Sequence, residues 1–314
     1  MALTIGVDVG GTKIAYGVVD EHGAIIERGL RHSPAGSPEK MALTIADAVT
    51  ELAARHSVEA VGIGAAGFVD ETRSVIRFAP NLAWREESLR EKVGELVGLP
   101  IVVENDANAM AWGEYRFGAG RGESHVLCVT VGTGIGGGIV LGGELYRGRW
   151  GMGAEFGHMQ AVPGGRACGC GNEGCWERYA SGSALLMEAR NNAQADPEGA
   201  AHLLRLGGGS VEGVQGEHVT EAARQGDRAA LAAFESLARW LAQGLADMAA
   251  VLDPGCFIIG GGVSGAADLF VDRVREEFAA RLTGRGHRPL AEIRVAEMGP
   301  SAGLVGAADL ARFR

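Results

Sequence analysis

The sequence contains no long apolar run and no excess of basic residues. No stretch continues long enough without polar residues to span a bilayer, and the first residues, Met1–Asp8, lack a basic start followed by an apolar segment. Lys and Arg number 29 against 39 Asp and Glu, so the formal net charge at pH 7 is -10. Nucleic acids and anionic membranes bind clusters of Lys and Arg. We therefore expect neither as a partner, and we expect a cytoplasmic location.

Cysteine is also scarce. The chain has 5 cysteines, and three of them lie with one histidine in a stretch broken by glycines: His158, Cys168, Cys170 and Cys175. Thiolate sulfur and imidazole nitrogen are the ligands that tetrahedral zinc prefers, and glycines allow so short a backbone to fold around one ion. Four protein ligands leave no position for water. The stretch therefore predicts a structural zinc ion.

These cysteines have two other interpretations. Buried free cysteine is often a small core residue, which suits Cys128 and Cys256 in their apolar runs, whereas the stretch from Cys168 to Cys175 has almost no apolar residues. A disulfide is the second alternative. The odd count of 5 and the lack of a secretory leader argue against it, because clustered thiols in a cytosolic protein are more often metal ligands. We therefore prefer zinc.

Glycine, in contrast, is abundant. The chain has 51 glycines, which gather in small groups at the ends of expected strands. Backbone N–H groups in a glycine turn can converge on an anion because no Cβ blocks the approach. The length of 314 residues, with 46% hydrophobic and 22% charged residues, allows a large core and predicts two lobes.

Two segments share one plan: an apolar strand, a glycine-threonine turn and a second apolar strand. They are residues 7–13 and 129–135. The repeat predicts two α/β lobes whose glycine turns border a cleft. In the first lobe we expect strands at 3–9, 14–19, 24–30 and 58–65, and a helix from Met41 to Leu52. In the second we expect strands at 125–130, 138–141, 144–146, 256–259 and 293–295, and helices at 229–252, 268–282 and from 299 onward.

Three glycine turns are candidates for holding a nucleotide. They comprise Gly10, Gly11, Thr12 and Lys13, then Gly132, Thr133 and Gly134, and finally Gly260, Gly261 and Gly262. The first two would grip the phosphates, and the third, between a strand and a helix, would admit the adenosine. Each turn alone proves little, since hairpins need glycine without binding anything. Lys13 is equally well explained as a solvated surface lysine. The repetition of the turn strengthens the interpretation.

Two carboxylates are candidates for the chemistry. Asp8 ends an apolar strand beside the first turn, where burial is costly without a cation, so we expect it to hold Mg²⁺ directly or through water. Asp106 lies in the run Glu104-Asn-Asp-Ala-Asn108 at a strand-to-helix corner. Asn and Asp also cap helices, but capping cannot use every polar side chain of this run. In phosphoryl transfer to an alcohol an aspartate accepts the hydroxyl proton, and Asp106 is our candidate for this general base.

Five motifs together resemble the ROK family of sugar kinases and repressors. They are Asp8-Val-Gly-Gly-Thr12, Glu104-Asn-Asp-Ala-Asn108, Gly132-Thr-Gly-Ile-Gly-Gly-Gly138, Glu155-Phe-Gly-His158, and Cys168-Gly-Cys170 with Cys175. The resemblance covers essentially the whole chain and is closest to the bacterial, in particular actinobacterial, kinases that act on glucose. The histidine and cysteine stretch with its glutamates is highly specific, whereas the glycine turns are shared with all actin-like ATPases.

The resemblance implies a fold, a domain division and further site residues. The implied fold is α/β, a two-lobed actin-like ATPase fold that duplicates a ribonuclease-H-like unit and carries a zinc-binding insertion. The implied domains are a small N-terminal lobe at 1–116, to which a C-terminal helix at 301–314 returns, and a large lobe at 117–300 with the zinc knot at 158–175. The implied sugar ligands are Gly67, Asn81, Asn105, Asp106, Glu155, His158 and Glu177. One ring nitrogen of His158 would bind zinc and the other would contact the sugar, so that the metal orients the ring.

The implied reaction is the ATP-dependent phosphorylation of glucose at its 6-hydroxyl, with Mg²⁺ neutralising the phosphates, in a homodimer or homotetramer. Other hexoses (mannose, fructose, N-acetylmannosamine) and other donors (polyphosphate, ADP) stay open, because their pockets differ only subtly. A sugar-responsive repressor is disfavoured, since such regulators carry a helix-turn-helix domain before the first motif and only seven residues precede Asp8. An actin-like ATPase that drives assembly would leave the glutamates unexplained.

Overall fold

The structure, a computed structural model, describes residues 2–80 and 82–313 and divides into two compact units. Unit 1 comprises Met1–Cys128, Gly137–Ala154 and Ala296–Arg314, and unit 2 comprises Val129–Gly136 and Glu155–Val295. The domain boundaries expected from the sequence stay a prediction. Within the described residues, no helix is both long and apolar enough to cross a membrane.

Unit 1 is built on a five-stranded sheet with the order β3-β2-β1-β4-β8. The strands are β1 (Leu3–Val9), β2 (Lys13–Val19), β3 (Ile25–His32), β4 (Val58–Ala65) and β8 (Ile101–Asn105). The first three form an antiparallel meander, and β4 and β8 continue the sheet as parallel neighbours. The predicted strands at 3–9 and 58–65 are confirmed with the same bounds, because each is a nearly continuous apolar run.

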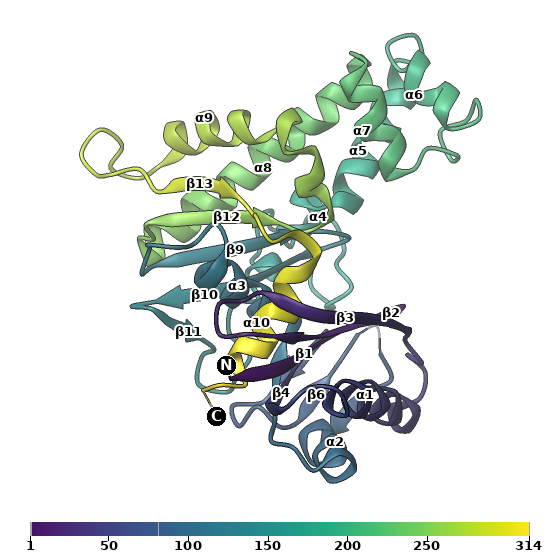
Figure 1. Ribbon diagram of the computed structural model, residues 1–314. Helices are drawn as coiled ribbons and strands as arrows, with labels where there is room; N and C mark the ends of the chain where they lie inside the picture. The colour runs from purple at the N-terminus through teal and green to yellow at the C-terminus, as the bar shows by residue number, and fades with distance from the viewer. Residues whose placement is uncertain (1, 81, 314) are drawn as a thin grey trace. The chain divides into compact units, whose positions relative to one another are not determined.

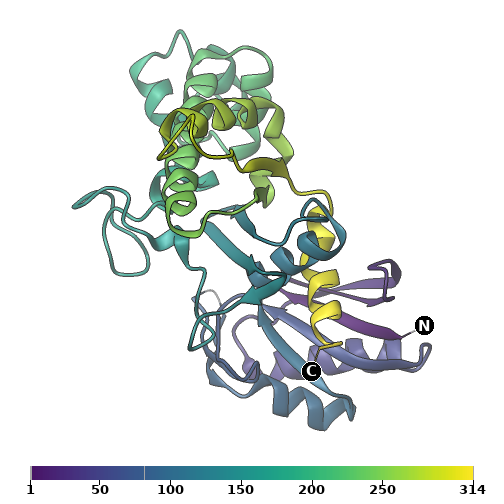
Figure 2. The same ribbon diagram turned by 90° about the vertical axis from the view of Figure 1, so that its left-hand side faces the viewer.

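Successive side chains of β1 point to opposite faces of this sheet, and different helices cover these two faces. Ile5 and Val7 are fully buried in one hydrophobic cluster with Ile45 of helix α1 (Pro38–Ala53). The predicted helix over Met41 to Leu52 is thereby confirmed, and its N-cap is Ser37, whose hydroxyl accepts the N–H of Lys40. The opposite face of the sheet is covered by the C-terminal helix α10 (Ala302–Leu310), drawn in yellow beside the purple strands (Figure 1; Figure 2).

Helix α10 approaches the sheet more closely than any side chain would allow. A Cβ atom on Gly6 of β1 would lie 2.0 Å from the carbonyl oxygen of Leu304, and one on Gly62 of β4 would lie 1.7 Å from that of Ala307. Glycine at both positions therefore lets backbone pack against backbone. The short helix η3 (Gly299–Ser301) leads into α10.

Further elements of unit 1 lie before and after β8 in the sequence. Helix α2 (Leu89–Val97) precedes that strand and helix α3 (Asp106–Phe117) follows it. A small antiparallel sheet of β5 (Phe68–Val69), β6 (Ile76–Phe78) and β7 (Arg85–Glu87) comes after β4. The sequence analysis did not identify this sheet, because strands of two or three residues leave no measurable alternation.

A second five-stranded sheet has the order β11-β10-β9-β12-β13. Its strands are β9 (Val126–Val131), β10 (Ile135–Leu141), β11 (Glu144–Tyr146), β12 (Cys256–Gly260) and β13 (Glu292–Val295). The predicted strand at 144–146 is confirmed with the same bounds. The predicted strands at 256–259 and 293–295 are confirmed within one residue.

Unit 2 contains a set of helices. They are η1 (Phe156–His158), α4 (Glu177–Ala180), α5 (Gly182–Ala195), α6 (Ala201–Leu206), α7 (Gly216–Arg224), α8 (Arg228–Leu252), η2 (Gly262–Leu269) and α9 (Val271–Arg281). The long helix predicted at 229–252 is confirmed as α8, whose N-cap Asp227 accepts the N–H of Ala230. Its buried stripe includes Leu237, Leu241 and Leu245.

The close approach of α10 yields a stability prediction. Replacing Gly62 by Ala places a Cβ atom 1.7 Å from a backbone oxygen of α10, so the helix must shift. We expect the free energy of unfolding to fall by about 1–3 kcal/mol, measured by denaturant titration. Gly36→Ala is the matched control, because a Cβ there meets nothing within 4 Å. Equal stability of the two variants would contradict this packing.

Candidate functional site

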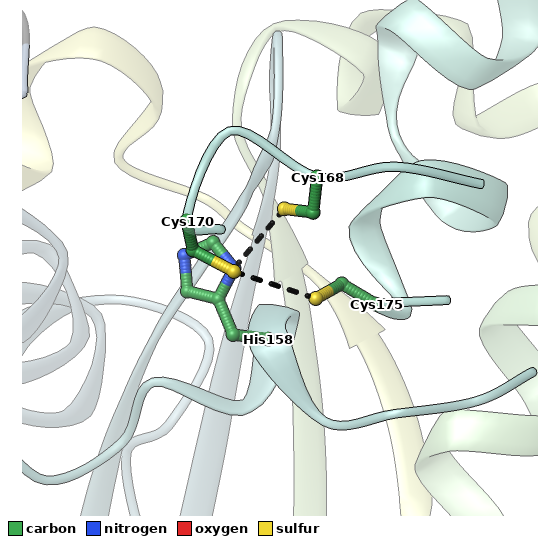
Figure 3. Close-up of side chains that lie close together, drawn as sticks. All are labelled: His158, Cys168, Cys170 and Cys175. Atoms are coloured by element: carbon green, nitrogen blue, oxygen red, sulfur yellow. Dashed lines mark hydrogen bonds between the residues drawn. The ribbon is translucent and has the colours of Figure 1, made fainter. Parts of the chain in front are cut away.

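The four predicted zinc ligands come together in unit 2 (Figure 3). One ligand atom from each of His158, Cys168, Cys170 and Cys175 lies within 4.8 Å of the others. The Sγ atoms of Cys170 and Cys175 are 3.6 Å apart, and Nδ1 of His158 is 3.7 Å from Sγ of Cys168. This donor set and its spacing suit a tetrahedral ion.

Tight turns bring the cysteines together. Isolated β-bridges join Gln160 to Cys175 and Ala167 to Glu173, which folds the stretch back on itself. Gly174 has a φ of 76°, and a Cβ atom on it would lie 1.7 Å from the carbonyl oxygen of Val162. The backbone therefore requires glycine here, and the position of the last cysteine follows from it.

Burial raises the pKa of the Cys168 thiol to about 12, and its hydrogen bond to Glu177 also raises it. A thiol in such a place does not ionise at neutral pH by itself. A bound cation reverses this preference, because it stabilises the thiolate directly. The residues present therefore fit a metal ion.

Glu177 joins this cluster to the second glycine turn. Its Oε1 accepts a hydrogen bond from Sγ of Cys168 at 3.1 Å and lies 3.8 Å from Nδ1 of His158. Its Oε2 accepts the N–H of Ile135 at 3.4 Å and would lie 2.4 Å from a Cβ atom on Gly134. Glu155 directly precedes η1, where its carbonyl oxygen accepts the N–H of His158 at 3.0 Å. All the unit 2 candidates for sugar contact are thus held near the cluster.

The unit 1 candidates lie where β8 turns into α3. The side chain of Asn105 caps α3 by accepting the N–H of Asn108 at 3.0 Å, and its Nδ2 donates to the carbonyl oxygen of Gly67 at 3.1 Å. Asp106 is the first residue of the helix, and its Oδ1 accepts the N–H of Ala107 at 3.0 Å. The cap thus belongs to Asn105. The predicted ligand Asn81 lies outside the described residues.

The two candidate acids of unit 1 interact electrostatically. Burial raises the pKa of Asp106, although the N–H of Ala107 opposes the shift. The pKa of Asp8, at the end of β1, is raised to about 6, mainly by burial and next by the charge of Asp106, while Lys13 opposes the shift. Shifts of this kind cluster at functional sites. The carboxyl ends of β1 and β8 therefore form one acidic site.

The two predicted phosphate turns are hairpin turns. In the first, the N–H of Gly10 donates to the carbonyl oxygen of Lys13 at 3.0 Å, and Lys13 itself is exposed. In the second, the N–H of Gly132 donates to the carbonyl oxygen of Gly134 at 3.0 Å. The hydroxyl of Thr130 also accepts the N–H of Gly136 there.

The third turn borders a hollow in unit 2. Gly261 has a φ of 84°, and a Cβ atom on it would lie 2.6 Å from the carbonyl oxygen of Val131, so this position requires glycine. The hollow measures about 500 Å³. It is lined by Gly182, Leu185, Gly216, Glu217, Thr220, Glu221, Arg224, Gly262, Val263, Gly265 and Ala266. Sequence reasoning missed its α7 side, because that helix carries an ordinary amphipathic pattern without a motif.

The raised pKa of Asp8 gives a pH prediction for the protein without Mg²⁺. The folded state holds this proton more tightly than the unfolded chain, so the stabilising contribution is complete below pH 3.8 and is lost as the pH rises through about 6. We expect Asp8→Asn to raise the melting temperature above that of the unsubstituted protein at pH 8, by a few degrees, and much less at pH 4.5. Thermal scans in magnesium-free buffer measure this. A difference that is independent of pH would contradict it.

Comparisons with known proteins agree with the geometry. The profile of the ROK family matches residues 4–314. The glucokinase of Streptomyces coelicolor is 54% identical over 312 residues, which cover 99% of this chain and 98% of that protein. The crystal structure of a ROK family glucokinase from Streptomyces griseus in complex with glucose and AMPPNP covers 100% of both chains at 56% identity, with a TM-score of 0.89.

A ROK hexokinase from Thermus thermophilus is 36% identical with a TM-score of 0.79, over 99% of this chain and 98% of that one. The predicted α/β fold of the actin-like ATPase type is thereby confirmed, and the histidine and cysteine cluster agrees with its zinc-binding insertion. The chain belongs to the ROK family.

Proposed function

We infer that this protein is a glucokinase, which transfers the γ-phosphoryl group of ATP to the 6-hydroxyl of glucose. The observation that carries this inference is the full-length similarity to a glucokinase whose structure holds glucose and an ATP analogue. The acidic site of unit 1 and the histidine and cysteine cluster of unit 2 supply the chemistry that such a reaction needs.

Asp106 is the general base. It takes the proton of the 6-hydroxyl while the oxygen bonds to the γ-phosphorus and the bond to the β-phosphate oxygen breaks, which leaves ADP. Burial raises its pKa, and a carboxylate with a raised pKa is a stronger base toward a hydroxyl proton. Because Asp106 begins α3 and Asn105 caps that helix, the backbone that carries the base is held in one position.

The sugar ligands that we propose fall into two groups. Gly67 and Asn105 are joined by a hydrogen bond and contribute with Asp106 from unit 1, whereas Glu155, His158 and Glu177 contribute from unit 2. Nδ1 of His158 faces the sulfur atoms, which leaves Nε2 for a sugar hydroxyl. When Cys168 is a thiolate it no longer donates to Glu177, so Oε1 of that carboxylate can accept from the sugar.

The nucleotide is held by the three glycine turns. The turns at Gly10–Lys13 and Gly132–Gly134 hold the phosphates through backbone N–H groups. The hollow beside Gly262 takes the adenosine, and its volume of about 500 Å³ is in the range of ligand pockets. Asp8 would hold Mg²⁺, directly or through water, and this cation would supply positive charge beside the phosphates.

The ion at His158, Cys168, Cys170 and Cys175 is zinc, and its role is structural because four protein ligands fill its coordination shell. We further propose a cytoplasmic location, where ATP and reduced thiols are both found, and a homodimer or homotetramer, as the family implies. Mannose, fructose and N-acetylmannosamine are the alternative acceptors, and polyphosphate and ADP are the alternative donors.

A kinetic experiment tests the assignment. With ATP and Mg²⁺ we expect glucose to give the highest kcat/KM in a panel of the four sugars, and Asp106→Asn to lower kcat by about 10²-fold or more because the proton has no acceptor. An assay that measures the sugar phosphate formed with each sugar and each donor determines both.

The melting temperature of Asp106→Asn shows whether this variant is folded. Burial disfavours the charged form of Asp106, so a neutral amide there is not expected to lower the melting temperature. Retention of more than a tenth of the kcat by a folded Asp106→Asn variant would rule out this base. Turnover of no sugar by the unsubstituted protein would rule out the kinase function.

Zinc content provides an independent prediction. Cys175 is fully buried in the cluster, so Cys175→Ser is expected to abolish the equimolar zinc and to raise the KM for glucose, because His158 loses its orientation. Elemental analysis and kinetics measure the two effects. Cys256→Ser is the control, since that cysteine is equally buried in β12 and should leave zinc unchanged. Full zinc in the Cys175 variant would contradict the ligand set.

A further inference from the structure

A carboxylate directly before the catalytic corner is buried with two arginines, and nothing in the proposed chemistry uses it. Glu104 of β8 is 1% exposed. We propose that Arg147, held by Glu104, is a positioning residue. It fixes the segment 147–154, which leads into the sugar ligand Glu155, to the corner that carries Asp106. This proposal rests on the sugar-kinase function proposed above.

The two oxygens of Glu104 have different partners. Oε1 accepts the backbone N–H of Asn105 at 2.9 Å and the side-chain amide of Asn108 at 3.1 Å. Oε2 lies 2.8 Å from Nε of Arg147 and 3.2 Å from Nε of Arg73. One oxygen therefore holds the backbone where the strand turns into α3, and the other faces both guanidinium groups. The carboxylate links the catalytic corner to the arginines.

Arg147 contacts a third segment with its remaining nitrogens. Its two terminal nitrogens donate to the carbonyl oxygens of Asp70, at 2.9 Å, and of Glu71, at 3.2 Å. These residues belong to the turn after β5, which the side chain of Asp70 fixes by accepting the N–H groups of Ser74 and Val75. The planar fork of arginine suits this task, because it binds acceptors in two directions at once. The side chain is only 10% exposed.

The segment after Arg147 lies tightly against the same turn. The N–H of Gly153 donates to the carbonyl oxygen of Arg147 at 2.8 Å, which closes the segment into a loop. Gly151 has a φ of 80°, and a Cβ atom on it would lie 2.5 Å from the carbonyl oxygen of Val69. Only Ala154 separates this loop from Glu155. The position at which the chain enters the sugar-binding stretch is therefore set by the contacts of Arg147.

Arg147 can be replaced without leaving the buried charge of Glu104 unpaired, because Arg73 also faces that carboxylate. The backbone of Arg73 is also fixed, with a φ of 56° and a carbonyl oxygen that accepts the N–H of Val103 at 3.1 Å. If Arg147 is removed, Glu104 keeps Arg73 as its cation. Replacing Glu104 instead would leave two guanidinium groups without a buried partner, which is a strongly destabilising change. Arg147 is therefore the residue to change.

The experiment compares Arg147→Met and Arg147→Lys with the unsubstituted enzyme. We expect kcat/KM for glucose to fall at least tenfold in both variants, mainly through a higher KM for glucose, because sugar ligands displaced by about 1 Å bind both glucose and the transition state less tightly. The KM for ATP should change less than twofold. Lys keeps the positive charge beside Glu104 but lacks the fork that reaches the two carbonyl oxygens, so it should not restore glucose affinity.

Arg312→Met is the matched control. Arg312 has the same arrangement in the same unit: its Nε faces the buried Asp309 at 3.5 Å, and its terminal nitrogens donate to the carbonyl oxygens of Ala2 and Val19. Its loss should lower the melting temperature and leave both KM values unchanged, as expected for a purely structural arginine.

Three outcomes would overturn the proposal: unchanged kcat/KM for glucose in Arg147→Met, full recovery in Arg147→Lys, or an equal rise in glucose KM in Arg312→Met. Should Arg147→Met not fold, Arg147→Lys decides the question alone. An unsubstituted protein that phosphorylates no sugar would count against the kinase function instead, so the two failures are distinguishable.

Discussion

A negative charge that is taken out of water needs a cation or hydrogen bonds nearby, and the site is arranged around this constraint. Glu104 receives its cations from the fold itself, as two arginines. For Asp8, Lys13 only partly offsets burial and the charge of Asp106, and its pKa stays raised at about 6. The protein itself thus neutralises the charge of Glu104, whereas the charge of Asp8 is not fully compensated, which supports the proposal that Asp8 binds a cation.

The same distinction separates the residues that fix the geometry of the proposed site from Asp106, the base that we propose. The side chain of Asn105 caps α3 and donates to the carbonyl oxygen of Gly67, so it fixes the start of the helix relative to Gly67. Asp106 accepts a hydrogen bond from its neighbour Ala107 and keeps further oxygen lone pairs for a hydroxyl. In unit 2, the cluster orients His158 from one side of its ring. Rigid supports of this kind lower the cost of ordering the substrate.

Local patterns predicted much of the fold. The strands at 3–9 and 58–65 and the helix α8 were found because each repeats its apolar residues over several periods. The cysteine cluster was found because its ligands are close in sequence. The small sheet after β4 was missed because its strands are too short for a period. Arg147 was missed because an arginine in a glycine-rich loop looks like any solvated one, and only the tertiary structure shows its buried partner.

The docking of α10 on β1 and β4 has a consequence for biosynthesis. The strands β1 and β4 leave the ribosome well before α10, yet the face of their sheet that includes Gly6 and Gly62 is covered by that helix. Until residue 310 has emerged, this sheet has one bare face, which is the kind of surface that chaperones bind and that aggregates. Folding of unit 1 is therefore completed only after α10, which follows the whole of unit 2 in the sequence, has been made.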